Sequence, residues 1–87
     1  MTKSVYTERY GQFRLRLIRA RKTAGLTQAE VAARLSRPQS YVSKYERGER
    51  RLDVVELFEI AEAIGFDPAE FLKTLDDRRL PRRSRSP

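Results

Sequence analysis

Apolar residues in the first part of the chain recur at intervals of three and four positions: Tyr10, Phe13, Leu17, Ala20 and Ala24. This spacing places side chains on one face of an α-helix, the face that packs against a core. Thr7 precedes the stripe as an N-cap, and Gly25 follows it where a left-handed residue commonly ends a helix. The pattern predicts a first helix over residues 8–24.

Two shorter helices are predicted next. Thr27 and Glu30 have the spacing of a capping box, in which each side chain bonds the backbone N–H of the other residue. A second helix therefore starts here and runs to about Leu35. Pro38 suits the first position of a helix, because its missing N–H is not needed there. We expect a third helix over residues 38–46.

The remaining apolar stripes predict a fourth and a fifth helix. Asp53 and Glu56 form a second capping box at the start of the fourth. Its buried face comprises Leu57, Ile60, Ala61 and Ile64. Residues 67–70 (Asp-Pro-Ala-Glu) combine an N-cap, a proline and an acid at the third position, so a fifth helix covers about residues 68–75. No segment is convincing as a strand, and the predicted fold class is all-α, one five-helix domain over residues 7–76.

The two ends of the chain lack this periodicity. Residues 1–6 are expected to be a flexible arm. Residues 77–87 are rich in Arg, Ser and Pro and have too few apolar side chains to bury. They are expected to form a disordered basic tail.

Composition narrows the possible chemistry. The chain has 87 residues and no Cys or His, which excludes a disulfide scaffold, a Cys/His zinc site and a thiol or imidazole nucleophile. The apolar runs are too short for a membrane span or a signal peptide. We expect a cytoplasmic protein that is not an enzyme and carries no metal or cofactor.

Charge is distributed unevenly along the chain. Residues 9–51 hold twelve Lys and Arg against three Glu, residues 52–77 hold one Lys against eight acids, and residues 78–87 hold five Arg and no acid. This distribution predicts a basic front, an acidic back and a basic tail, and a basic surface attracts polyanions. Ribosomal, membrane-surface and heparin-type binders share this property, so charge alone leaves nucleic acid as one candidate partner among several.

The second and third predicted helices have the residue pattern of two helices that cross closely. Ala32 is the small residue that lets the helices approach, and Val42 is the branched apolar residue that meets it. The opposite face of the third helix is polar and consists of Gln39, Ser40, Ser43, Lys44 and Arg47. These positions share one exposed helical stripe.

Residues 25–32 (Gly-Leu-Thr-Gln-Ala-Glu-Val-Ala) and 41–48 (Tyr-Val-Ser-Lys-Tyr-Glu-Arg-Gly) resemble the Cro/CI phage-repressor-type helix-turn-helix, also called the XRE family. The apolar positions of the fourth helix match as well, so the resemblance covers about residues 10–75. It implies a lambda-repressor-like DNA-binding domain with a helix-turn-helix at about residues 28–47. The third helix then enters the major groove of double-stranded DNA as the recognition helix.

The resemblance also implies roles for individual residues. The residues expected to contact bases are Gln39, Ser40, Ser43 and Lys44. The residues expected to contact the DNA backbone are Gln28, Arg37, Tyr41, Arg47, Arg50 and Arg51. The chemistry fits, since Gln can bond adenine bidentately and Lys can donate to guanine. The alternative prediction for Tyr41 is that its ring is half-exposed and packs at the edge of the domain.

Arg21 and Glu46 match a family pair that joins the first and third helices by a partly buried ion pair. Two positions depart from the family pattern. Ser36 stands where glycine is common in the turn, so a left-handed backbone there would cost about 1 kcal/mol. Arg37 and Pro38 stand where a capping Ser or Thr is expected, so the amides of the third helix are left for an indirect cap or for a phosphate.

The function predicted from the sequence is a sequence-specific transcriptional regulator, a repressor that binds a palindromic operator as a homodimer in the nucleoid. Candidate dimer contacts are Phe58, Phe66, Phe71, Leu72 and Leu75. The alternatives are an antitoxin or adaptor whose C-terminal helices bind a toxin or another regulator, and a charge-driven RNA binder. The solvent-facing acids Glu56, Glu59, Glu62 and Glu70 would keep DNA away from the back of the domain.

Overall fold

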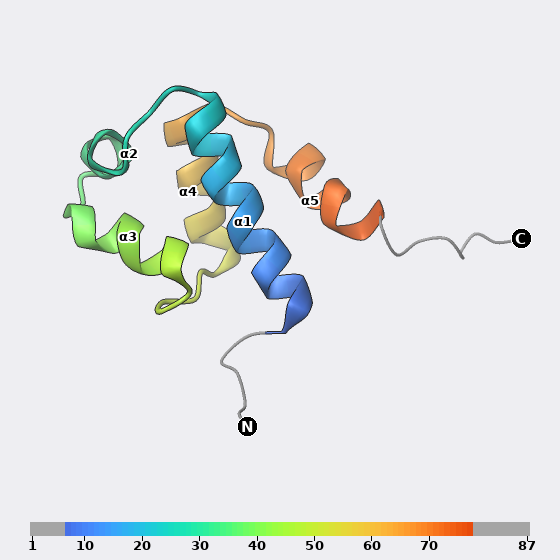
Figure 1. Cartoon of the computed structure of the whole chain (residues 1–87). Coiled ribbons are helices and arrows are strands. Elements are labelled where there is room, and N and C mark those ends of the chain that lie inside the picture. The colour runs from blue at the N-terminus through green and yellow to red at the C-terminus, as the bar shows by residue number, and fades with distance from the viewer. Residues whose placement is uncertain (1–6, 78–87) are drawn as a thin grey trace, which may run out of the picture.

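The computed structural model describes residues 7–77, in which all five predicted helices are present (Figure 1). They are α1 (Glu8–Thr23), α2 (Gln28–Leu35), α3 (Gln39–Arg47), α4 (Val54–Ile64) and α5 (Pro68–Asp77). This described part contains no strand, so the fold class is all-α. The predicted arm over residues 1–6 and residues 78–87 of the predicted tail lie outside the described residues. Asp77, assigned to the tail from the sequence, is the last residue of α5.

The helices begin where their capping residues predict. The Thr7 hydroxyl accepts from the N–H of Tyr10 at 3.1 Å. Thr27 and Glu30 form both bonds of a capping box, at 3.0 and 2.8 Å. Asp53 and Glu56 form the second box, at 2.8 and 2.9 Å. These side chains satisfy amides that have no partner inside a helix, which explains why the helix starts could be predicted from the sequence.

The third helix differs from its prediction by one residue at each end. Pro38 has an extended backbone, with φ −69° and ψ 155°, and is the N-cap rather than the first helical residue. Helix α3 therefore starts at Gln39 and ends at Arg47, where Gly48 takes the left-handed conformation with φ 83°.

The core lies between the first four helices. Its most completely buried side chains are Leu17 of α1, Val31 of α2, Val42 and Tyr45 of α3, and Ile60 of α4. The predicted stripe of the first helix is only partly right. Phe13 and Ala20 are half-buried against this core, but Ala24 is exposed because the helix ends at Thr23.

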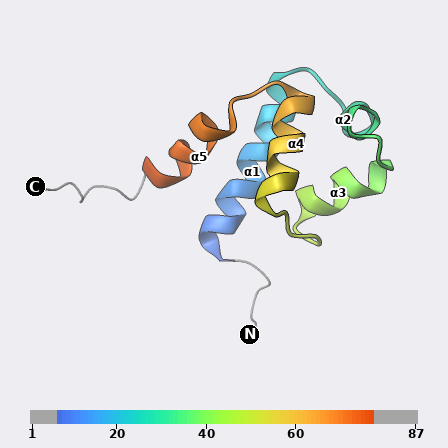
Figure 2. The same cartoon turned by 180° about the vertical axis from the view of Figure 1, so that it is seen from behind.

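Helix α5 completes the domain on the side of α1 away from α3 (Figures 1 and 2). The Phe71 ring stacks on Phe66 with centroids 4.8 Å apart and meets the edge of Phe13 at 5.8 Å. Leu75 is only 8% exposed. Helix α5 is thus held in place by aromatic packing against α1 and by the loop from α4.

Two further features concern the described residues as a whole. None of their helices is both long enough and apolar enough to cross a membrane. They also contain no group of three or more His, Cys, Asp or Glu placed to hold a metal ion.

Candidate nucleic-acid interface

Helices α2 and α3 cross closely at Ala32 and Val42, as the sequence pattern predicts. The exposed fraction is 2% for Ala32 and 0% for Val42. The turn between the helices is closed by two backbone bonds, from the N–H of Ser36 to the Ala33 carbonyl at 3.1 Å and from the N–H of Arg37 to the Ala32 carbonyl at 3.0 Å. Ser36 is left-handed, with φ 57° and ψ 43°. The turn therefore keeps the geometry that glycine would adopt without strain.

Four polar side chains predicted to read bases lie together on the outer face of α3. Gln39, Ser40 and Lys44 are exposed. Ser43 is half-buried, and its hydroxyl donates to the Ser40 carbonyl at 3.3 Å, so only its oxygen lone pairs remain for a base. No side chain caps the N-terminus of α3. The positive end of its helix dipole therefore lies beside Gln39 and Ser40, an arrangement that favours an anion.

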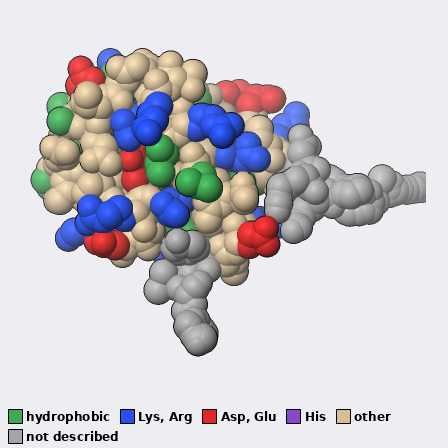
Figure 3. All heavy atoms as spheres, viewed as in Figure 1, with side chains coloured by type: hydrophobic (Ala, Val, Ile, Leu, Met, Phe, Trp, Pro, Cys, Tyr) green, Lys and Arg blue, Asp and Glu red, His purple; other side chains and the backbone are tan. Residues whose placement is uncertain are grey.

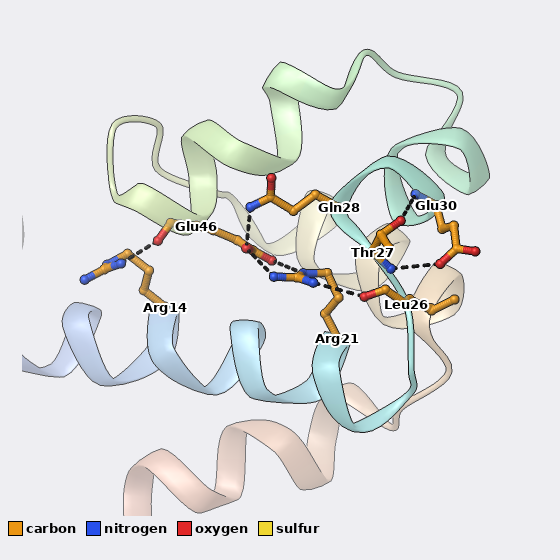
Figure 4. Close-up of polar contacts among 7 residues, drawn as sticks. All are labelled: Arg14, Arg21, Leu26, Thr27, Gln28, Glu30 and Glu46. Atoms are coloured by element: carbon orange, nitrogen blue, oxygen red, sulfur yellow. Dashed lines mark hydrogen bonds and ion pairs between the residues drawn. The ribbon is translucent and has the colours of Figure 1, made fainter.

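The inner face of α3 is fixed by a buried carboxylate. Glu46 is 3% exposed, and its oxygens accept from Nε of Arg21 at 2.7 Å and from Nη2 of Arg21 at 3.0 Å (Figure 4). Hydrogen bonding to Glu46 raises the pKa of Arg21 above its ordinary value. The third guanidinium nitrogen, Nη1, donates to the Leu26 carbonyl at 3.0 Å. The predicted ion pair thus joins α1, the α1–α2 loop and α3.

Two more side chains converge on Glu46. Nε2 of Gln28 donates to Oε1 of Glu46 at 2.8 Å, so the residue that opens α2 packs against α3. Arg14 donates through Nη1 to the Glu46 backbone carbonyl (Figure 4). The contact of Arg14 with α3 was not predicted from the sequence. The signal was its seven-residue separation from Arg21, which places both side chains on the same face of α1.

Tyr41 does not have the half-exposed ring expected from the sequence. Its side chain is buried, with 7% exposure for the residue, and its ring meets the edge of the Tyr45 ring at 5.6 Å. The guanidinium groups of Arg37 and Arg50 lie over the Tyr41 ring at 4.5 and 4.8 Å from its centroid. The ring therefore packs within the protein, and it also serves as a platform for two cations, which was not predicted.

Arg50 and Glu56 form an ion pair between the loop after α3 and the start of α4. Nη2 of Arg50 lies 2.8 Å from Oε2 of Glu56, and this hydrogen bond lowers the pKa of Glu56 and raises that of Arg50. Glu56 also closes its capping box. The prediction that Glu56 faces solvent is wrong, because both of its oxygens are occupied by neighbours and its side chain is 16% exposed.

The other predicted backbone-contacting arginines are at the surface. Arg47 pairs with Glu49 through two bonds, at 2.9 and 3.1 Å, with both side chains more than half exposed. Hydrogen bonding from Arg47 lowers the pKa of Glu49. The Arg51 guanidinium lies over the Tyr10 ring at 4.1 Å from its centroid. Such exposed pairs add little stability, so Arg47 can exchange Glu49 for another anion at small cost.

A helix-turn-helix family model matches residues 17–71. The uncharacterised HTH-type transcriptional regulator y4dJ of Sinorhizobium fredii (strain NBRC 101917 / NGR234) is 42% identical over 59 residues, which are 68% of this chain and 77% of that protein. The solved structure of an XRE-family like protein from Pseudomonas syringae pv. tomato str. DC3000 has 49% identity and a TM-score of 0.81, covering 83% of this chain and 88% of that one. The chain belongs to the XRE-type helix-turn-helix family. It is therefore a DNA-binding transcriptional regulator and not an enzyme.

A second solved structure supports the same assignment. The restriction-modification controller protein C.AhdI from Aeromonas hydrophila is 32% identical, with a TM-score of 0.65, over 71% of this chain and 90% of that one. Two XRE-type relatives above 30% identity thus share this helix arrangement.

The basic residues of this XRE-type protein do not form one surface. Arg37, Lys44 and Arg47 lie on or beside α3, whereas Arg16 and Arg19 lie on α1 beside α5. In the view of Figure 3, Lys and Arg side chains gather over the face that α1 presents, and most acidic side chains lie near its edges. The basic residues of the segment 9–51 are therefore spread over several elements and are not confined to α3.

The candidate dimer contacts of this XRE-type protein divide into exposed residues and residues packed in the domain's own core. Phe58 and Leu72 are exposed, at 53% and 40%. Leu75 is buried, and Phe66 and Phe71 pack half-buried on the domain's own core, so these three serve the monomer's fold. Val54 and Val55, which are 66% and 65% exposed on α4, were not among the residues predicted from the sequence. Both residues lie in the first turn of α4, directly after the capping residue Asp53. At these positions the sequence pattern did not indicate whether an apolar side chain is buried or exposed.

Proposed function

We propose that this XRE-type regulator is a repressor that binds a palindromic operator as a homodimer on nucleoid DNA, with α3 in the major groove. The observation that carries the proposal is the outer face of α3. It presents Gln39, Ser40, Ser43 and Lys44 side by side, while Glu46 on the inner face fixes the orientation of the helix. Amide, hydroxyl and ammonium groups are the donors and acceptors that distinguish base pairs in the major groove.

The length of this face limits how much sequence one copy can read. Gln39 and Lys44 are separated by five residues, a rise of about 7.5 Å along the helix axis. This corresponds to roughly two or three base pairs at a spacing of about 3.4 Å. Two copies on half-sites about 34 Å apart would double the sequence read and explain a palindromic operator.

The proposed backbone contacts surround this face. Arg37 lies at the N-terminal side of α3, and Arg47 and Arg51 lie at or after its C-terminal end. Gln28 opens α2, with its amide oriented by Glu46. Arg50 is held by Glu56 and Tyr41, so its proposed role is to position the loop after α3 beside the DNA backbone.

The proposed dimer surface is an apolar surface on α4 and α5, made of Val54, Val55, Phe58 and Leu72. All four side chains are at least 40% exposed. Val54 and Leu72 flank the same small hollow between α1, α4 and α5. Contiguous exposed apolar surface of this kind is typical of protein interfaces.

Phe58→Ser tests this surface. We expect the variant to weaken the dimer by roughly tenfold in dissociation constant, because it removes an aromatic side chain from the interface. Sedimentation equilibrium of the full chain over a range of concentrations measures the change. Leu15→Ser is the matched control, since Leu15 is also 53% exposed but lies on α1. A wild-type protein that stays monomeric both free and on its operator would contradict the dimer.

Selection from a pool of random duplexes, at low and high salt, tests the function itself. We expect enrichment of a two-fold symmetric motif that persists as salt rises. Phosphate contacts weaken as the salt concentration rises whatever the sequence, whereas base contacts preserve discrimination between sequences. Full salt sensitivity without any enriched motif would instead indicate a charge-driven binder of nucleic acid. A reporter gene placed downstream of the enriched motif should be expressed less when the protein is present.

A further inference from the structure

A groove runs between α1 and α5 on the side of the domain away from α3. Its volume is about 420 Å³, within the range of about 300–1,000 Å³ found for small-ligand sites. Ala20 of α1 and the stacked rings of Phe66 and Phe71 contribute apolar surface to it. We call this the α1–α5 groove.

Two cations of α1, Arg16 and Arg19, border the α1–α5 groove. Neither forms an ion pair within the described residues, and none of the residues that line the groove is acidic. Nε of Arg16 is buried and has no hydrogen-bond acceptor in the described part of the chain. The positive charges of Arg16 and Arg19 are therefore not compensated beside the groove by any described residue, and this favours an anionic occupant.

The α1–α5 groove and the recognition helix lie on opposite faces of α1. Arg14 and Arg21 are seven residues apart and both bond Glu46 of α3. Arg16, Arg19 and Ala20 fall on the other side of α1, because successive residues turn by about 100°. Figure 1 shows the same arrangement, with α3 and α5 on opposite sides of α1. A molecule in the groove and DNA on α3 would therefore not collide.

We propose that the α1–α5 groove binds a small apolar carboxylate, an acyl or aromatic acid. The carboxylate pairs with Arg16 and Arg19, and its apolar body lies on Ala20, Phe66 and Phe71. Charge selects the anion, because a carboxylate can accept hydrogen bonds from guanidinium groups and a neutral alcohol of the same length gains no ion pair. The apolar surface selects against small hydrophilic anions, which gain nothing from its burial.

Decanoate is the probe, titrated below its micelle concentration into the isotope-labelled full chain. The amide resonances of residues 16–24 and 64–74 are expected to shift and saturate, while those of α4 beside Phe58 stay in place. The neutral matched probe is 1-decanol, and acetate tests the carboxylate without the apolar body. Both should bind at least tenfold more weakly than decanoate, the free-energy difference of one charge-assisted hydrogen bond or of a few buried methylenes.

Arg16→Gln and Arg19→Gln should each weaken decanoate binding by roughly tenfold. Lys22→Gln is the matched control, because Lys22 is exposed on the same helix and does not line the groove. Equal binding of decanoate and 1-decanol, equal losses in Lys22→Gln, or shifts centred on α4 would each overturn the proposal. If Arg16→Gln leaves decanoate binding intact and instead changes the dimer dissociation constant, the groove belongs to a second copy and the proposal is wrong. Operator selection does not involve these residues, so failure here leaves the proposed repressor function standing.

Discussion

Arg21→Met is expected to lower the free energy of unfolding by about 3–5 kcal/mol, the usual cost of removing one partner from a buried ion pair. Glu46 would keep its burial but lose both hydrogen bonds from Arg21, while the bond from Gln28 would remain. The Leu26 carbonyl would lose its bond from Nη1 as well. Urea denaturation followed by circular dichroism measures the change.

The neighbouring Lys22→Met is the control, because Lys22 is exposed and its side chain is similar in length to that of Arg21. It should change stability by less than about 0.5 kcal/mol. The double variant Arg21→Met/Glu46→Met should recover most of the loss, since an apolar pair leaves no uncompensated buried charge. A loss below 1 kcal/mol in Arg21→Met, or no recovery in the double variant, would show that the network contributes less than its burial indicates.

Gln39→Ala and Lys44→Ala are each expected to weaken binding to the selected operator by about 1–3 kcal/mol, with little change on random DNA. Both side chains are exposed and neither forms an ion pair within the described residues, so their removal should leave the fold unchanged. Gel shifts with operator and scrambled duplexes at one fixed salt concentration measure the two affinities.

Arg47→Ala provides the contrast. As a proposed phosphate contact it should weaken both duplexes alike and reduce the salt dependence of binding by about 0.9 in the log–log slope. If Gln39→Ala and Lys44→Ala behave like Arg47→Ala, these side chains do not read bases, and the operator is selected by another part of the protein.

Local chemistry in the sequence determined most of the fold. Capping residues such as Thr27 and Asp53 act within three positions along the chain, so the helix starts could be predicted without knowing what packs on them. The same holds for the crossing of Ala32 and Val42 and for the outer face of α3, because helical spacing alone sorts those positions into inner and outer sides.

Contacts between a helix and the loops or helices that pack on it could not be predicted in this way. The burial of Tyr41 depends on Arg37 and Arg50 closing over its ring, and the loss of Glu56 from the surface depends on Arg50. Leu75 looked like a candidate interface residue until the packing of α5 on α1 placed it inside the monomer. In each case helical spacing allows the side chain to be either exposed or buried, and the packing of a neighbouring loop or helix determines which of the two occurs.

The XRE-type helix-turn-helix domain and the pairing of Arg21 with Glu46 could both be predicted from the sequence, because the residues involved repeat with the period of a helix or match a known motif. The tertiary structure decided how the charges are divided. Segment charge predicted one basic front, but the orientation of α1 turns Arg14 and Arg21 toward α3 and Arg16 and Arg19 toward α5. A helix has more than one face, and tertiary packing determines which element contacts each face. The net charge of a segment does not contain this information.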